Sequence, residues 1–178
     1  MSKSGVLGLL AAILLIAACA TRPAPVAVVP PERPPMPAKA DRVLVLKGER
    51  QLRLIAGSRV LRSYRIALGS EPEGPKRRKG DGRTPEGSYT LAGRNPRSSF
   101  HRSIRISYPD RADRERAARQ GVDPGGDIVI HGLPDGKGWI GADHSRHDWT
   151  QGCIAVTNAE MDEIWAMVDD GTPIEIRP

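Results

Sequence analysis

Cys153 is the residue of this 178-residue chain whose type and setting best suit nucleophilic chemistry. The chain has two cysteines, and the other, Cys19, closes an apolar N-terminal segment that predicts export. If Cys19 is removed with the segment or lipidated, Cys153 is the only thiol of an exported protein, and this needs a reason because thiols in oxidising compartments tend to form disulfides. The alternative is that Cys153 is a small buried apolar side chain. We favour a reactive thiol at this position.

His131 is the best candidate for the base that such a thiol requires, because the thiolate is the species that attacks a carbonyl. It follows the apolar run 128–130 and precedes Gly132, so it lies at the expected end of a strand, where loops build sites. A histidine bonded only to backbone is the structural alternative. The other three histidines lie among polar residues and are expected at the surface: His101, His144 and His147.

Gly152 and the apolar run 154–156 flank Cys153 and predict how its sulfur is positioned. A glycine lets the backbone come close to a substrate, and a strand after the cysteine would hold the sulfur on a rigid element. The expected site therefore joins two strands, one that ends in His131 and one that begins at Cys153.

Residues 41–178 predict one mainly β domain with two short helices, since about 138 residues can bury one adequate core. Apolar runs between glycines and prolines predict strands over 43–46, 51–55, 60–68, 88–91, 103–107, 127–130 and 173–176. The segment 111–120 is charged almost all round and predicts a surface helix. Thr157 and Glu160 form a capping box for a second helix, whose apolar face is Met161, Ile164, Trp165 and Val168.

The spacing around the two candidate catalytic residues resembles a known signature. Residues 130–132 read Ile-His-Gly, and after seventeen further residues 150–154 read Thr-Gln-Gly-Cys-Ile. The L,D-transpeptidase (YkuD-type) catalytic domain is similar, with His-Gly, a spacer and Ser/Thr-His-Gly-Cys. Residues 80–89 contain Thr-Pro-Glu-Gly and resemble the family's Thr-Pro-x-Gly segment, and 171–176 resemble its terminal strand.

The resemblance implies a β-sandwich-like fold and a cysteine acyl transferase that acts on peptidoglycan stem peptides through a thioester. Cys153 would be the nucleophile, His131 the general base and acid, and the backbone carbonyl of Gly132 the group that orients His131. Substrate binding or the oxyanion hole would involve Gly152, Thr150 and Gln151. No cofactor and no metal ion are implied.

Two residues depart from the family pattern. Gln151 stands where the family usually has histidine, and Ala155 stands where many members have arginine. The departures concern substrate placement and acceptor choice more than acyl-enzyme chemistry. They leave an L,D-endopeptidase or carboxypeptidase-type hydrolase as the alternative on the same scaffold.

Two other classes of protein compete with a thiol enzyme. A zinc hydrolase would use His144, His147 and either Cys153 or His131 as ligands, with Asp143 or Asp148 nearby, although no His-Glu-x-x-His pattern is present. A non-catalytic wall-binding lipoprotein would explain Gln151. Trp139 and Trp149 lie between the two motifs, where they could line a substrate cleft but are expected to pack the loop.

The first forty residues predict export and tethering. Residues 1–18 read as a signal peptide, and Ile-Ala-Ala-Cys at 16–19 resembles a lipobox that would lipidate Cys19 and form a membrane tether. Residues 19–40 hold seven of the sixteen prolines and predict an extended linker. The expected location is the periplasm or cell envelope.

The net charge of +6 is modest, and its densest cluster, Lys-Arg-Arg-Lys at 76–79, lies among glycines and a proline. We expect a solvated loop there rather than a nucleic-acid recognition helix. Export also argues against a nucleic-acid partner. The sequence indicates no oligomeric state.

Overall fold

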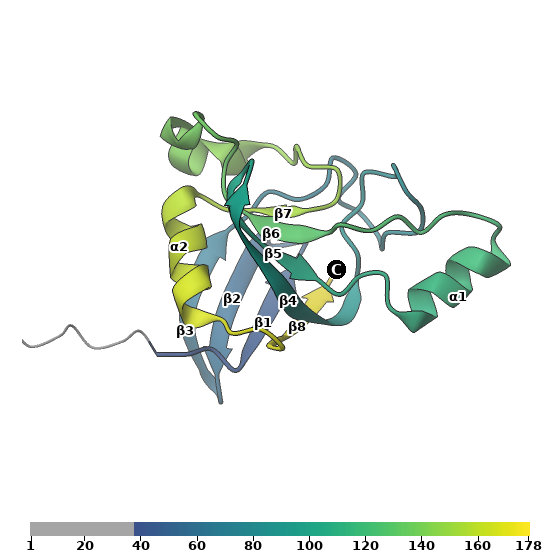
Figure 1. Cartoon of the computed structure of the whole chain (residues 1–178), viewed down its shortest axis with the longest axis horizontal. Helices are drawn as coiled ribbons and strands as arrows, with labels where there is room; N and C mark the ends of the chain where they lie inside the picture. The colour runs from purple at the N-terminus through teal and green to yellow at the C-terminus, as the bar shows by residue number, and fades with distance from the viewer. Residues whose placement is uncertain (1–37) are drawn as a thin grey trace, which may run out of the picture. The chain divides into compact units, whose positions relative to one another are not determined.

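Eight strands form one curled sheet in the computed structural model of the protein, which describes residues 38–178 (Figure 1). The expected signal peptide, Cys19 and most of the linker lie outside the described residues. The sheet order is β3-β2-β1-β8-β4-β5-β6-β7. The strands are β1 (Arg42–Leu46), β2 (Gln51–Ala56), β3 (Arg59–Arg65), β4 (Gly87–Ser98), β5 (His101–Ile106), β6 (Val129–His131), β7 (Ile154–Ala155) and β8 (Pro173–Arg177).

The first three strands form the antiparallel meander that the sequence predicts. Alternate residues of β1 and β2 face the core, as in Val43 and Val45, because successive side chains of a strand point to opposite faces. The C-terminal strand β8 lies parallel to β1 and places Ile174 and Ile176 beside these valines. The C-terminal strand thus extends the sheet that the meander begins.

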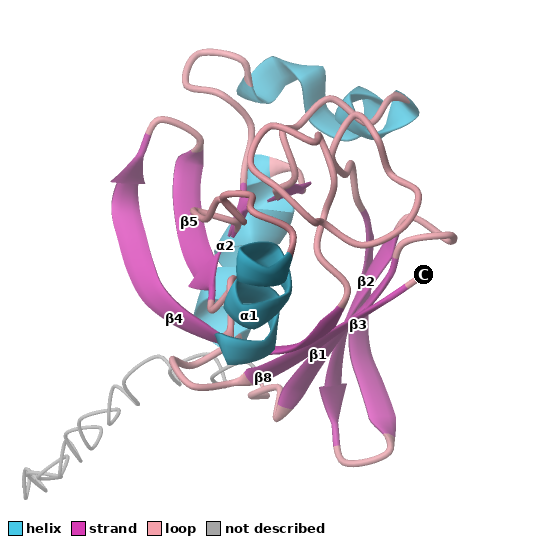
Figure 2. Cartoon of the chain, turned by 90° about the vertical axis from the view of Figure 1, so that its right-hand side faces the viewer, coloured by secondary structure: helices cyan, strands magenta, loops and turns pink. Residues whose placement is uncertain are grey.

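The long strand β4 joins the two halves of the sheet and produces its curl. Its first residues, 87–90, pair with β8, and its later residues pair with β5. A register shift between Ala92 and Arg94 surrounds Gly93, whose φ of 77° favours glycine. Figure 2 shows β4 curving from β8 round to β5. The expected mainly β, sandwich-like architecture is confirmed as a single sheet folded on itself.

Two α-helices and one 3-10 segment complete the fold: α1 (Arg111–Arg119), η1 (Gly138–Arg146) and α2 (Asn158–Met167). The capping box predicted for α2 is present, since Thr157 and Glu160 each accept a hydrogen bond from the other's backbone N–H. Helix α2 packs against β5 and β6 through Met161 and Ile164. Among the described residues, no helix has the length and apolar character needed to cross a bilayer.

Three details of these elements differ from the prediction. Trp165 is only partly buried: it packs against the edge of the core, and the Arg94 guanidinium lies 4.1 Å from the centre of its ring. Helix α1 is not wholly a surface helix, since Asp113 is buried and accepts a hydrogen bond of 3.0 Å from the Tyr89 hydroxyl. The strand expected over 60–68 ends at Arg65, because the next three residues leave β2 and approach β7.

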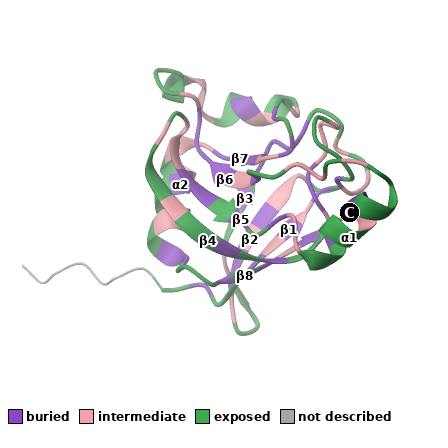
Figure 3. Cartoon of the chain, turned by 45° about the vertical axis from the view of Figure 1, so that its right-hand side comes forward, coloured by how far each residue is buried: buried purple, intermediate pink, exposed green. Residues whose placement is uncertain are grey.

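The two residues of β7 are fully buried, and Figure 3 shows this strand beside β6 within the buried part of the sheet. Ala67 and Ala155 exchange backbone hydrogen bonds of 3.0 and 2.9 Å. The segment 60–68, predicted as one strand, therefore pairs first with β2 and then, at Ala67, with β7.

Replacing Thr157 by Ala should lower the free energy of unfolding by about 1 kcal/mol, because it leaves N–H groups of the first turn of α2 without an acceptor. Urea denaturation measures the change, with Thr157→Ser as the matched control that keeps the hydroxyl. Equal losses in both variants would contradict a capping role.

Candidate active site

Cys153 immediately precedes β7, which lies parallel to β6 with Ile130 opposite Ile154 and His131 opposite Ala155. The Sγ atom lies 3.6 Å from the carbonyl oxygen of Asp127, to which the thiol donates. Continuing the register of β6 and β7 by one residue puts Cys153 opposite Val129. Because side chains alternate along a strand, Val129 and His131 share the face of the sheet on which the thiol lies. The fold thus brings the two predicted catalytic residues to neighbouring strands.

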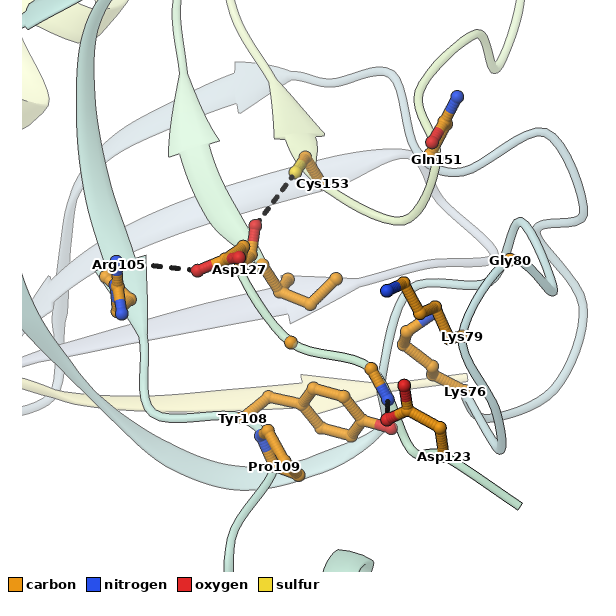
Figure 4. Close-up of a pocket in the computed structure, with 13 residues that line it drawn as sticks. Lys76, Lys79, Gly80, Arg105, Tyr108, Pro109, Asp123, Asp127, Gln151 and Cys153 are labelled. Carbon is orange, nitrogen blue, oxygen red and sulfur yellow. Dashed lines mark hydrogen bonds and ion pairs between the residues drawn. The ribbon is translucent and has the colours of Figure 1, made fainter. Parts of the chain in front are cut away.

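The thiol lines a cleft of about 580 Å³ (Figure 4). Cys153 is partly buried rather than sealed in the core. Gln151 lies at the same cleft and is exposed, and its side chain points away from the sulfur in Figure 4. A loop contributes Lys79 to the lining and strand β5 contributes Arg105. A substrate can therefore reach the sulfur from solvent.

The orientation of His131 is fixed by a hydrogen bond of 2.6 Å between its Nδ1 and the carbonyl oxygen of Gly132. A carbonyl oxygen can only accept, so Nδ1 carries the proton and Nε2 of the neutral ring has the free lone pair. The ring is 3% exposed and packs against Phe100 and Trp149, whose ring centres are 4.6 and 5.7 Å away. Within residues 38–178, no hydrogen bond joins the imidazole to the thiol.

Burial disfavours charge on both groups. It raises the pKa of the Cys153 thiol above its ordinary value, against the opposing effects of the Val129 backbone and the Lys76 ammonium. It lowers the pKa of His131 below its ordinary value, against the effect of the Gly132 carbonyl. The two groups therefore rest as thiol and neutral imidazole at neutral pH, and not as an ion pair.

Thr150 ties together the turn that carries the cysteine. Its hydroxyl donates to the carbonyl oxygen of Cys153 at 2.8 Å and accepts from the N–H of Gly152 at 3.1 Å. Gly152 has a φ of 125°, and a Cβ atom there would lie 2.5 Å from the carbonyl oxygen of Arg83. The close approach that the sequence suggested for this glycine is thus made to the protein's own backbone.

The Thr-Pro-Glu-Gly segment supports the turn that carries Cys153. Thr84 is fully buried, and its hydroxyl accepts from the N–H of Gly69 at 3.1 Å. Lys47, which the sequence analysis missed, is 2% exposed and donates to the carbonyl oxygens of Thr84 and Gly74 and to Glu86. The sequence did contain a sign that Lys47 is buried, because position 47 continues the inward-facing alternation of positions 43 and 45.

The basic cluster at 76–79 lies in a loop, as expected, but it is not simply solvated. Lys76 is 3% exposed, and its ammonium pairs with Asp81 at 2.8 Å. Burial tends to raise the pKa of Asp81, but bonds from Lys76 and from the backbone N–H groups of Arg77, Arg78 and Arg83 outweigh it and lower the pKa to about 2. The loop is therefore folded around one carboxylate.

The side chains proposed as zinc ligands do not converge. Asp148 accepts from the N–H of Leu68 and pairs with Arg50 at 2.8 Å, so it braces the fold. His144 is buried, not at the surface as expected, while His147 is exposed. In the part of the chain that the structure describes, no group of three or more His, Cys, Asp or Glu residues could hold a metal ion.

The two tryptophans between the motifs behave differently. Trp149 packs one side of its ring against His131 but is itself 37% exposed, so it is only partly the packing residue that was predicted. Trp139 is 83% exposed, so the expectation that it packs the loop is wrong. The reason is its position near the start of η1, where its side chain points to solvent and Ile140 is the partly buried neighbour.

Alkylation of Cys153 by iodoacetamide should accelerate with pH up to and beyond the ordinary thiol pKa of about 8.5, because the raised pKa keeps the sulfur protonated at neutral pH. The rate is measured by mass spectrometry in a Cys19→Ala variant, with glutathione as the free-thiol reference. A plateau reached below pH 7 would indicate a resting ion pair and contradict the neutral pair.

Replacing Asp81 by Asn should lower the free energy of unfolding by about 2 kcal/mol at pH 7, because a buried lysine and three N–H groups lose a charged acceptor. The folded pKa is depressed, so this stabilisation is present above pH of about 4 and is lost as the pH falls toward 2. Denaturant unfolding at several pH values tests both points. Asp169→Asn, which breaks the exposed pair with Lys39, should cost less than about 1 kcal/mol.

The model of one protein family, the L,D-transpeptidase catalytic domain (YkuD), matches residues 40–176. The Escherichia coli (strain K12) protein named "Putative L,D-transpeptidase YafK" is 32% identical over 134 residues, which are 71% of this chain and 46% of YafK. The chain thus spans about half the length of that relative.

Solved structures agree with this match. Pgp2 from Campylobacter jejuni, described as a helical cell shape determining protein, has a TM-score of 0.58 at 29% identity, covering 76% of this chain and 46% of Pgp2. An L,D-transpeptidase from Mycobacterium smegmatis has a TM-score of 0.50 at 15% identity, covering 76% and 58%, and shows the likeness of the fold. The expected fold type is confirmed, and the chain belongs to the L,D-transpeptidase catalytic domain (YkuD) family.

Proposed function

We propose that the protein is a cysteine acyl transferase that acts on peptidoglycan stem peptides in cell-wall cross-linking or remodelling. The observation that carries this proposal is the pairing of β6 with β7. It puts a solvent-reachable thiol and a histidine with a free Nε2 on neighbouring strands. Membership of the family supports the substrate class, and so does the likeness to a protein described as determining cell shape.

The reaction begins with proton transfer from Cys153 to Nε2 of His131. The thiolate attacks the carbonyl carbon of the third residue of a stem peptide and forms a tetrahedral oxyanion. As the oxyanion collapses, the peptide C–N bond breaks, and His131 returns the proton to the departing amine of D-alanine. The product is a thioester on Cys153 and a neutral imidazole. An amine from a second stem, or water, then attacks the thioester and restores the thiol.

Because both groups are neutral at rest, we expect the proton to move from Cys153 to His131 only when the substrate carbonyl is in place. Burial opposes a charged thiolate and a charged imidazolium when each is considered alone. Charge separation becomes favourable once a carbonyl group is in place to accept the electron pair of the sulfur. His131 therefore acts as a general base during attack, and its Nδ1 bond to the Gly132 carbonyl stabilises the imidazolium that forms.

The oxyanion needs N–H donors close to the sulfur. The Gly152 N–H, which the sequence analysis named for this purpose, already donates to the Thr150 hydroxyl. We assign the principal oxyanion contact to the N–H of Cys153, with Thr150 holding the turn in shape through the Cys153 carbonyl. Gln151 contributes to substrate contact at the rim of the cleft.

Hydrolysis is the second candidate outcome, because Gln151 and Ala155 replace family residues that are expected to influence acceptor choice. Mass spectrometry of the products from purified muropeptides separates a cross-linked dimer from a released tripeptide or an exchanged terminal residue.

Export and lipidation of Cys19 also remain proposals, because they depend on residues 1–37. Together with the proline-rich linker they would tether the catalytic domain in the periplasm or cell envelope. Intact-mass analysis of the purified native protein tests them. A mass that retains residues 1–18, or an unmodified Cys19, would exclude the lipid tether.

Replacing Cys153 by Ala or His131 by Ala should reduce kcat/KM on a tetrapeptide stem by about 10⁴-fold, because each removes one member of the nucleophile–base pair. His147→Ala, which removes an exposed histidine, is the matched control and should retain activity. Chromatography of released D-alanine gives the rates. Undiminished turnover in either catalytic variant would contradict the mechanism.

A carbapenem, which acylates family nucleophiles, should add one covalent adduct at Cys153 in the unmodified enzyme and none in Cys153→Ala. Peptide mass mapping locates the adduct. Lack of any adduct, together with tight binding to peptidoglycan, would favour the non-catalytic binding protein instead.

A further inference from the structure

The cations of the catalytic cleft come from a loop and a strand that are far from the cysteine motif in the sequence. Ala155, where many family members have arginine, is fully buried between His131 and Ala67, so this position places no charge in the cleft. The cleft instead contains Lys79 from the loop before the Thr-Pro-Glu-Gly segment and Arg105 from β5. Figure 4 shows these two residues on opposite sides of the cleft, with Cys153 between and above them.

Lys79 is held in place by its backbone while its side chain is exposed. Its N–H donates to the carbonyl oxygen of Asp123 at 2.7 Å. Gly125 packs so closely that a Cβ atom there would lie 3.1 Å from the Cα of Lys79. The amine of Lys79 points into the cleft in Figure 4. A fixed backbone with a free ammonium group is a suitable arrangement for receiving an anion.

The charges of the lining residues leave Lys79 as the available cation. Lys76 lines the cleft but is paired with Asp81. Arg105 is 3.4 Å from Asp127, and both side chains are well exposed, so this pair is weak and can be exchanged for another carboxylate. Among the described residues, no carboxylate lies within ion-pair distance of the Lys79 ammonium. The remaining acidic residue of the lining, Asp123, accepts a hydrogen bond from the N–H of Gly125.

We propose that Lys79, assisted by Arg105, binds the terminal carboxylate of the donor peptide and makes the enzyme select stem peptides with a free C-terminus. The inference rests on the proposed function, in which D-alanine is the leaving group. The terminal carboxylate then belongs to the residue directly after the attacked carbonyl, and consecutive Cα atoms are about 3.8 Å apart. The carboxylate therefore enters the cleft that the thiol, Lys79 and Arg105 all line.

The experiment compares one tetrapeptide stem with a free C-terminal carboxylate and the same peptide with a C-terminal carboxamide. The enzyme should favour the acid by about tenfold in kcat/KM, which is typical of one charge-assisted contact in a partly shielded site. Lys79→Met should lose most of that preference by slowing the acid alone. Arg105→Met should lose part of it. Lys39→Met, which removes a charge from the exposed pair with Asp169, should keep the full preference.

Binding to the Cys153→Ala variant keeps this test separate from catalysis. Calorimetry should show tighter binding of the acid than of the amide, and Lys79→Met in the same background should remove the difference. If the unmodified enzyme turns over neither peptide but acid-selective binding persists, the proposed function fails and the carboxylate site stands. If acid and amide bind equally, or if Lys79→Met leaves the preference unchanged, the carboxylate site is overturned.

Discussion

The pairing of the two-residue strand β7 with its neighbours on both sides is the constraint on which the active site depends. On one side, Ala155 exchanges two hydrogen bonds with Ala67, and on the other, the N–H of Val156 donates to the carbonyl oxygen of His131 at 3.0 Å. A strand of two residues would not hold its place through one partner alone. Because both sides are bonded and the strand is fully buried, the cysteine before it has one position relative to the histidine.

Close approaches between backbone segments next to β7 explain why glycines and threonines surround Cys153. At Gly69, a Cβ atom would lie 2.0 Å from the carbonyl oxygen of Gly82, so only glycine fits there. Thr84 and Thr150 then satisfy N–H groups in these segments that no sheet ladder reaches. Three sequence segments that lie far apart in the chain thus form one rigid support for the thiol.

The sequence predicted well those features that depend on local pattern. The capping box of Thr157 is set by residues three positions apart, and the meander follows from alternation and turns, so both could be read directly. The burial of Lys76 and of His144 could not be read in this way. It depends on which distant loops fold over them, and a charged residue in a glycine-rich segment gives no local sign of that. The family spacing predicted that Cys153 and His131 act together, and the structure places them on or beside the paired strands β6 and β7. The pKa directions of the two groups follow from their burial, which the sequence does not show.

The hydrogen bond from the Cys153 thiol to the carbonyl oxygen of Asp127 has a consequence for how readily the thiol is oxidised. Thiolates attack peroxides and disulfides far faster than thiols do, so a sulfur kept protonated at neutral pH is oxidised slowly. The burial that raises the pKa of the Cys153 thiol therefore also slows its reaction with oxidants.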